Sequence, residues 1–150
     1  MATIQELDNS KSIYHVHWHV FIIHFPISFF VAAFGFQILH LFTRPVCFED
    51  ATNVALIAGS VVLIPTTWSG WWTWKTRYHG AHVFIFQRKI MIAFIMQGLS
   101  LALAIWRVGF TGAFENDHTS MAHWTYLFGN TLLMIGASAE GYYGGRLNHR

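Results

Sequence analysis

Long apolar stretches alternate with short polar ones along the whole chain. Four of the apolar stretches are near or above the roughly 20 residues that a helix needs to cross the hydrocarbon core of a membrane. They predict helices at about residues 18–42, 52–75, 83–107 and 121–143. The expected fold is therefore all-α.

The polar segments between these stretches are too short to form a separate soluble domain. We therefore expect residues 1–150 to form one domain, an integral membrane bundle of four antiparallel helices. Only 11% of the residues are charged, against about 25% in soluble domains. Pro65 lies inside the second helix and is predicted to bend it, while Thr66 and Thr67 can donate to the carbonyls that it frees.

The basic residues predict the orientation. Seven of them fall at the end that holds both termini and the loop after the second helix, whereas the opposite end holds only Arg44 and Arg107. Positive charge is enriched on the cytoplasmic side of membrane proteins, so we expect both termini in the cytoplasm of a bacterial or archaeal cell, with the bundle in the inner membrane. The small net charge of +2 and the lack of a basic stripe argue against a nucleic-acid partner.

One cysteine, Cys47, limits the chemistry. It cannot form an internal disulfide, and a single thiol is too few for an iron–sulfur cluster or for covalent haem attachment. Glu140, the main acid within the predicted membrane segments, has no paired carboxylate beside it, and no Ser/His/Asp set can be assigned, so hydrolytic or group-transfer chemistry is not expected. An electron-transfer subunit of an oxidoreductase complex fits these limits better than an enzyme acting alone.

Histidine is the most informative residue type, because ionisable groups within membrane segments are candidates for function. The ten histidines fall into two groups at opposite ends of the predicted bundle. The cytoplasmic group consists of His15, His17, His19, His24, His79, His82 and His149, and the outer group of His40, His118 and His123. Histidines from different helices at one depth are the axial ligands that a non-covalently bound haem b requires.

Helical spacing supports this interpretation. His17, His24 and Gly35 share one face of the first helix, because they are seven and eleven residues apart. On the fourth helix, His123, Asn130, Met134 and Gly141 lie on one predicted stripe. The part of it formed by His123, Asn130 and Met134 should face the bundle interior, since an amide is costly against lipid.

The segment His19-Val-Phe-Ile-Ile-His24-Phe-Pro-Ile resembles the opening signature of small membrane proteins grouped as domain of unknown function 2231 (DUF2231). Later pieces match in order: Gly70 among aromatic residues, Arg77-x-x-x-Ala81-His82, and Gly144-Gly145-x-Leu147. Two positions depart from the family pattern, because Val20 stands in place of a proline and His149 follows the glycine pair too early. The resemblance implies a membrane bundle with histidines from both ends of the chain on one side, often associated with cytochrome components.

From these observations we predict one or two haem b groups. His24 and His82 are the expected ligands of an inner haem, and His40 and His123 those of an outer haem. Sixteen residues separate the two ligands of the first helix, or about 24 Å along its axis. Three further residues complete the predicted cofactor contacts: Gly35 and Gly70, which allow close approach, and Lys89, which either pairs with a propionate or extends to lipid headgroups.

The predicted function is that of a b-type cytochrome-like membrane subunit. It would exchange electrons with quinone and with a redox partner at the outer face, such as a c-type cytochrome, and would contact other membrane subunits. Two alternatives remain open. One is a haem-free accessory subunit, in which His40 caps its helix and His123 meets headgroups. The other is a metal-binding protein that uses His15, His17 and His19, of which the first and last are spaced i, i+4.

Overall fold

The computed structural model describes the backbone of residues 4–77, 79–80, 84–110 and 120–148, and the side chains of residues 21–76, 79–80, 87–110 and 120–145. Its secondary structure is all helical within these ranges, which confirms the predicted all-α class. The four helices are α1 (Ile4–Thr43), α2 (Val46–Arg77), α3 (Phe84–Gly109) and α5 (Met121–Asn148). Each of the four predicted helices corresponds to one of them.

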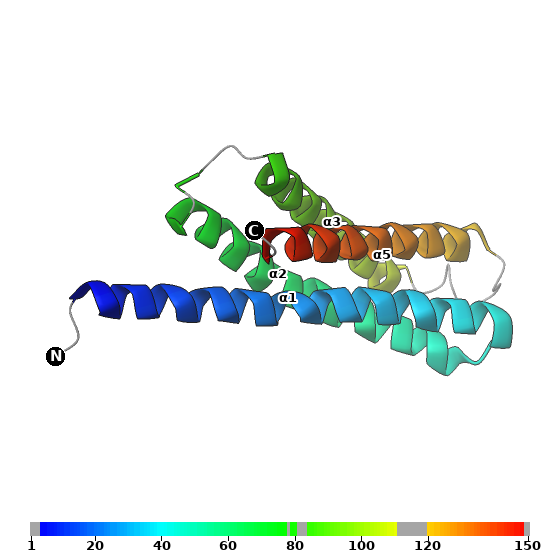
Figure 1. The fold of residues 1–150 in the computed structure, drawn as a ribbon. Helices are drawn as coiled ribbons and strands as arrows, with labels where there is room; N and C mark the ends of the chain where they lie inside the picture. Colours follow the sequence, from blue (N-terminus) through cyan, green and yellow to red (C-terminus); the bar gives the residue numbers. More distant parts are fainter. Residues whose placement is uncertain (1–3, 78, 81–83, 111–119, 149–150) are drawn as a thin grey trace.

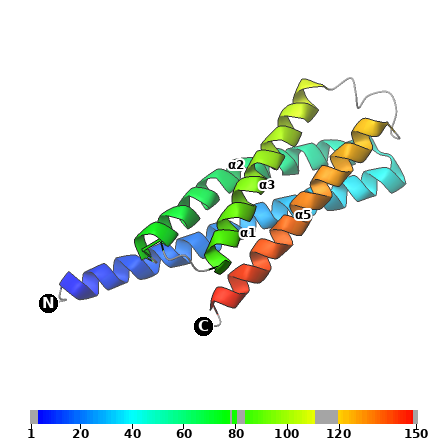
Figure 2. The same cartoon turned by 90° about the horizontal axis from the view of Figure 1, so that it is seen from above.

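The helices lie antiparallel in chain order and enclose a common interior. α1 packs against α2 and α5, and α3 packs against the same two helices. α1 begins and α5 ends at the same end of the bundle, while α1 turns into α2 at the opposite end (Figures 1 and 2). The outer-end histidines of α1 and α5 therefore belong to neighbouring helices, which connectivity alone did not establish.

Three helices are long and apolar enough to cross a membrane: Phe21–Thr43, Val46–Thr76 and Gln87–Gly109. Large hydrophobic side chains cover their outer surfaces, for example Phe42, Val54 and Ile105, which are 78%, 67% and 70% exposed. Such a surface suits lipid. α5 spans 28 residues, and its buried face carries polar side chains such as Asn130 and Glu140.

The helix ends differ from those predicted at three places. α1 begins at Ile4 instead of near residue 18, so its backbone extends through the polar N-terminal segment. α2 begins at Val46, directly after Pro45, because proline does not interrupt a helix at its start. α5 continues through Gly144 and Gly145 to Asn148, five residues beyond the predicted end at residue 143.

Both internal prolines lie within continuous helices. α1 runs through Pro26 and α2 runs through Pro65. The Thr66 hydroxyl donates to the Val62 carbonyl at 2.8 Å. Pro65 frees the carbonyl of Val61 and not that of Val62, so this hydrogen bond does not supply the compensation that was expected of Thr66. The predicted bend at Pro65 stays a prediction.

The core is apolar in its middle and polar at its ends. Phe30, Leu56, Leu133 and Ala137 are at most 1% exposed. Close contacts hold the helices together around them: a Cβ added at Gly59 would lie 2.9 Å from the Phe30 ring, and one at Gly136 would lie 2.8 Å from the Met96 sulfur. The polar ends of this interior contain the candidate site.

Candidate metal centre

His40 reaches the interior from the last turn of α1. It is 5% exposed, and its Nδ1 lies 3.0 Å from the Pro45 carbonyl oxygen. The chain can turn back here because Arg44 adopts a left-handed φ of 66° and its N–H donates to the His40 carbonyl at 2.8 Å, which ends the helix. A carbonyl only accepts, so Nδ1 carries a hydrogen and Nε2 is the ring atom directed elsewhere.

His123 reaches the same region from the first turn of α5. Ser120 precedes this helix, and its hydroxyl lies 3.0 Å from the His123 Nδ1 and 3.5 Å from the His123 backbone nitrogen. A serine at this position is typical of a helix N-cap. Ser120 therefore both starts the helix and orients the imidazole, which is 9% exposed.

Glu49 completes the cluster from the first turn of α2. Its Oε1 accepts a hydrogen bond from the Arg107 Nη2 at 2.7 Å, and Arg107 comes from the last turn of α3. Each of the four helices thus contributes one side chain. Both members of this ion pair are largely buried, with side chains 13% and 11% exposed. A buried carboxylate requires such a partner, because an uncompensated charge is costly away from water.

The two imidazoles face this carboxylate. The Glu49 Oε2 lies 3.7 Å from the His40 Nε2, and the Glu49 Oε1 lies 3.6 Å from the His123 Nε2. The rings are 6.1 Å apart between centroids and only 19° from parallel. One ligand atom from each of His40, Glu49 and His123 can be chosen so that all three lie within 4.8 Å of one another.

These distances suit a cation better than direct hydrogen bonds. They exceed ordinary hydrogen-bond lengths, and they are a few tenths of an ångström above the roughly 3.3 Å that separates two ligands of one tetrahedral metal ion. In a neutral His40 ring with hydrogen on Nδ1, the Nε2 lone pair points at a carboxylate. That contact is favourable only when a proton or a metal cation lies between the two groups.

The groups that contact the two imidazoles from behind also resemble those of known metal sites. Histidines that bind metals usually donate their second ring nitrogen to a carbonyl or another protein group, which fixes the ring. Pro45 and Ser120 occupy these positions for His40 and His123. The donor set, two imidazoles and one carboxylate, is typical of non-haem iron and zinc sites.

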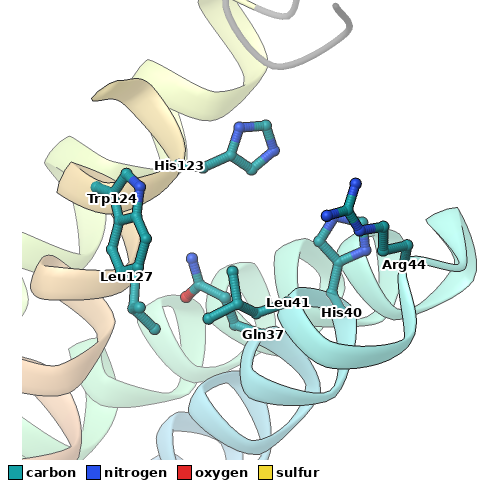
Figure 3. A pocket seen from close by; sticks show the side chains of 7 residues that line it. All are labelled: Gln37, His40, Leu41, Arg44, His123, Trp124 and Leu127. Carbon is teal, nitrogen blue, oxygen red and sulfur yellow. The ribbon is translucent and has the colours of Figure 1, made fainter. Parts of the chain in front are cut away.

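A pocket opens beside the two histidines, between α1 and α5 (Figure 3). Its volume is about 40 Å³, enough for about three water molecules. Trp124 and Leu127 line it on the α5 side, and Gln37, Leu41 and Arg44 on the α1 side. A haem macrocycle needs far more room, and the Glu49 carboxylate already lies against both Nε2 atoms. A haem at this position would require Glu49 to withdraw, so the outer haem stays a prediction, whereas the present arrangement has the ligand atoms for an ion.

A buried pair of amide side chains links α5 to α1 next to the site. The Asn130 Nδ2 donates to the Gln37 Oε1 at 2.7 Å, and Asn130 is 1% exposed. This contact joins α5 to α1 one to two turns from the histidines. The prediction that Asn130 faces the interior is confirmed, and the same holds for His123. Met134, the third residue expected to face the interior, is half-buried, and Gly141 farther along the stripe is exposed, because the stripe drifts around the helix with distance.

The predicted inner site is less complete. His24 is exposed, and a Cβ at Gly35 would meet nothing within 4 Å, so their shared face points away from the other helices. His82 and His118 lie outside the described residues, as do the side chains of His15, His17 and His19. The inner haem therefore stays a prediction.

Lys89 and Gly70 were the other predicted cofactor contacts. The Lys89 ammonium lies 3.5 Å from the Glu140 carboxylate, and these side chains are only 16% and 10% exposed. This ion pair between α3 and α5 is neither of the two roles expected for Lys89. Gly70 is half-buried on α2.

Sequence reasoning missed Glu49 and Arg107 as members of the site. Arg107 had been counted only as a positive charge at the outer end, and Glu49 lies before residue 52, near which the second helix was expected to begin. The missed signal is local: an acidic residue in the first turn after a proline is typical of a helix start. Glu49, Leu56 and Leu63 then repeat at intervals of seven and share the buried face.

No family model, curated protein or solved structure matches the chain. The resemblance to DUF2231 therefore stays a prediction, and the site must be interpreted from its own geometry.

Proposed function

We propose that this chain is a multi-pass membrane subunit that binds one transition-metal ion through His40, Glu49 and His123. One observation supports this most strongly: three ligand atoms from three helices lie within 4.8 Å of one another at buried or nearly buried positions. The cluster is held from behind, since Pro45 and Ser120 orient the two imidazoles. Such a preformed arrangement lowers the entropic cost of binding an ion.

The ligand types favour iron among the available metals. Two histidines and one carboxylate, with positions left for other ligands, are the set found in non-haem Fe(II) sites. Zinc accepts the same donors, so the ligand set alone allows both. Iron changes its oxidation state, and an iron centre would give the chain the electron-transfer role predicted from its sequence. Quinone and an outer-face redox protein remain the proposed exchange partners.

Arg107 gives this centre an unusual charge balance. With neutral histidines, Glu49 and Arg107 sum to zero, so a bound divalent ion would add its full charge to a largely buried cluster. This cost lowers metal affinity. We therefore expect binding in the micromolar range, weaker than at structural zinc sites.

Metal analysis of protein purified in detergent tests the proposal. After dialysis against Fe(II), Co(II) or Zn(II) without oxygen, the protein should hold about one ion per chain, and the Co(II) form should show d–d absorption bands. His40→Ala, His123→Ala and Glu49→Gln should each lower the stoichiometry to near zero. His24→Ala and Asp50→Asn are matched controls, because these residues are exposed and should leave it unchanged.

The outcome that overturns the metal site is specific. Loss of metal in the control variants, or retention in all three ligand variants, would mean that the ion binds elsewhere, for example at the N-terminal histidines. Far-ultraviolet circular dichroism of each variant separates loss of metal from loss of fold.

A bis-histidine haem is the second candidate. The buried, nearly parallel rings of His40 and His123 favour it, although Glu49 would have to withdraw. The same variants distinguish the two functions. Haem would be favoured if the protein shows the reduced-minus-oxidised absorption bands of a b-type cytochrome and these bands disappear in His40→Ala and His123→Ala. The bands should persist in Glu49→Gln, because Glu49 would not be a ligand of that haem. Loss of such bands in His24→Ala would support the inner haem.

We also propose how the chain lies in the membrane. Three helices have the length and composition to cross, and we propose that α5 crosses with them because it packs against α1 and α3. Both termini would lie in the cytoplasm and the metal centre at the outer face of the inner membrane of a bacterium or archaeon. A neighbouring subunit would cover part of the exposed apolar surface.

A further inference from the structure

The pocket between α1 and α5 reaches the candidate metal centre from one side. His40 and His123 both line it, whereas Glu49 and Arg107 do not. When three protein ligands occupy one face of an ion, the remaining coordination positions lie on the opposite face. The pocket is thus placed where an ion held by these residues would have an open position.

The size of the pocket limits what can enter. Its volume of about 40 Å³ corresponds to about three water molecules, which is room for a ligand of two or three heavy atoms. Leu41 and Leu127 form apolar walls on the α1 and α5 sides. A quinone ring is far larger and cannot enter without displacing these side chains.

The polar groups around the pocket are mainly donors. Arg44, which directly follows the end of α1, lies at its margin, and the Gln37 amide nitrogen points into it (Figure 3). The Gln37 Oε1 already accepts a hydrogen bond from Asn130, so the amide NH₂ is the end left to donate. A guanidinium, an amide donor and a metal cation together favour an anion over a cation or a neutral molecule.

We infer that this pocket admits a small anion of two or three heavy atoms to an open coordination position of the metal centre. The inference rests on the proposed metal-binding function and specifies the class of ligand that the same site takes. Azide, nitrite and formate have the required size and charge. Leu41 and Leu127 control the size of the ligand, and Arg44 contributes to its charge preference.

Azide titration of the Co(II)-loaded protein in detergent tests this inference. Azide should shift the Co(II) bands with a single saturating phase. Arg44→Asn should weaken azide binding about threefold, the size expected for one exposed charge. Asparagine is chosen because it tolerates the left-handed backbone that this position adopts.

A second pair of variants tests the pocket itself. Leu41→Trp should fill it and abolish the azide shift while one Co(II) per chain remains bound. Leu39→Trp is the matched control: Leu39 lies on the same helix, is 44% exposed and is not part of the pocket lining, so the azide shift should persist.

Failure of the inference is distinguishable from failure of the proposed function. If the unmodified protein binds no Co(II), the metal centre itself is wrong. If Co(II) binds but azide leaves its spectrum unchanged, or if Leu41→Trp and Leu39→Trp respond alike, the anion pocket is wrong and the metal centre stands.

Discussion

His40 shows how a single contact sets the chemistry of a side chain. The Pro45 carbonyl accepts from Nδ1, so Nε2 is the atom that faces Glu49. His123 is held in a similar way by a hydroxyl instead of a carbonyl. The two rings are thereby oriented in the absence of an ion. At this scale, the residues behind the ligands matter nearly as much as the ligands themselves.

Removing the hydroxyl behind His123 should weaken the metal centre without destroying it. In Ser120→Ala, the His123 ring loses its orienting partner, and we expect metal affinity to fall about 10- to 100-fold. Titration of the apoprotein with Co(II), followed by its visible absorption, measures this.

Ser138→Ala provides the control for that change. Ser138 is an exposed serine on the same helix, and its hydroxyl donates to the Met134 carbonyl. Its removal should leave Co(II) affinity within about twofold. Equal affinities for Ser120→Ala and Ser138→Ala would contradict the role given to Ser120.

At the scale of the helices, position along the axis decides which groups meet. α2 begins immediately after Pro45, so Glu49 lies in a helical turn and on the face that also carries Leu56 and Leu63. Farther along, Gly59 allows α1 and α2 to approach, because Phe29 and Phe30 occupy the space that a side chain would need. This close packing fixes the axial position of His40 relative to Glu49.

A bulky residue at Gly59 should separate these two helices. In Gly59→Leu, the Cβ would lie 3.1 Å from the Phe29 Cβ and 2.9 Å from the Phe30 ring, an overpacking that typically costs 1–3 kcal/mol. Gly35→Leu is the control, since a Cβ there meets nothing within 4 Å. Both variants gain similar helix propensity, so this gain cancels in the comparison.

We therefore expect the free energy of unfolding of Gly59→Leu to be about 1–3 kcal/mol below that of Gly35→Leu. Titration with a denaturing detergent, followed by far-ultraviolet circular dichroism, provides the measurement. Equal stability of the two variants would show that α1 and α2 do not pack through Gly59.

For the whole molecule, the charged pairs lie near the two ends of an apolar interior. The Glu49–Arg107 pair contacts His123, and the Lys89–Glu140 pair lies at the other end. His123 and Glu140 are 17 residues apart on α5, or about 25 Å, which is close to the thickness of a membrane's hydrocarbon core. The metal centre would then lie at the boundary between lipid and headgroups, within reach of a partner outside the membrane.

Labelling of cysteines in intact bacterial cells tests this orientation. Cys47 is exposed at the α2 end that carries the metal centre, and a membrane-impermeant maleimide should label it from outside. In a Cys47→Ser background, Lys75→Cys at the other end of α2 should be labelled only after the cells are permeabilised. Labelling of both from the same side would exclude a crossing by α2, and the reverse pattern would invert the orientation.

The four helices and the burial of Asn130 could be predicted from the sequence, because they follow from the period and length of apolar runs. Lipid-facing composition and helix number are local properties of this kind. The sequence also allowed His40 to be paired with His123, because both lie at the same predicted depth.

Two features came from the packing of the helices alone: α1 and α5 are neighbours, and Glu49 and Arg107 lie beside the histidines. Local patterns do not specify which helix packs beside which, nor how far one slides along another. A helix start six residues earlier than predicted moved Glu49 from a loop into the interior. The distances between candidate ligand atoms on different helices change when one helix shifts along another by a single turn. Packing between the helices sets these axial positions.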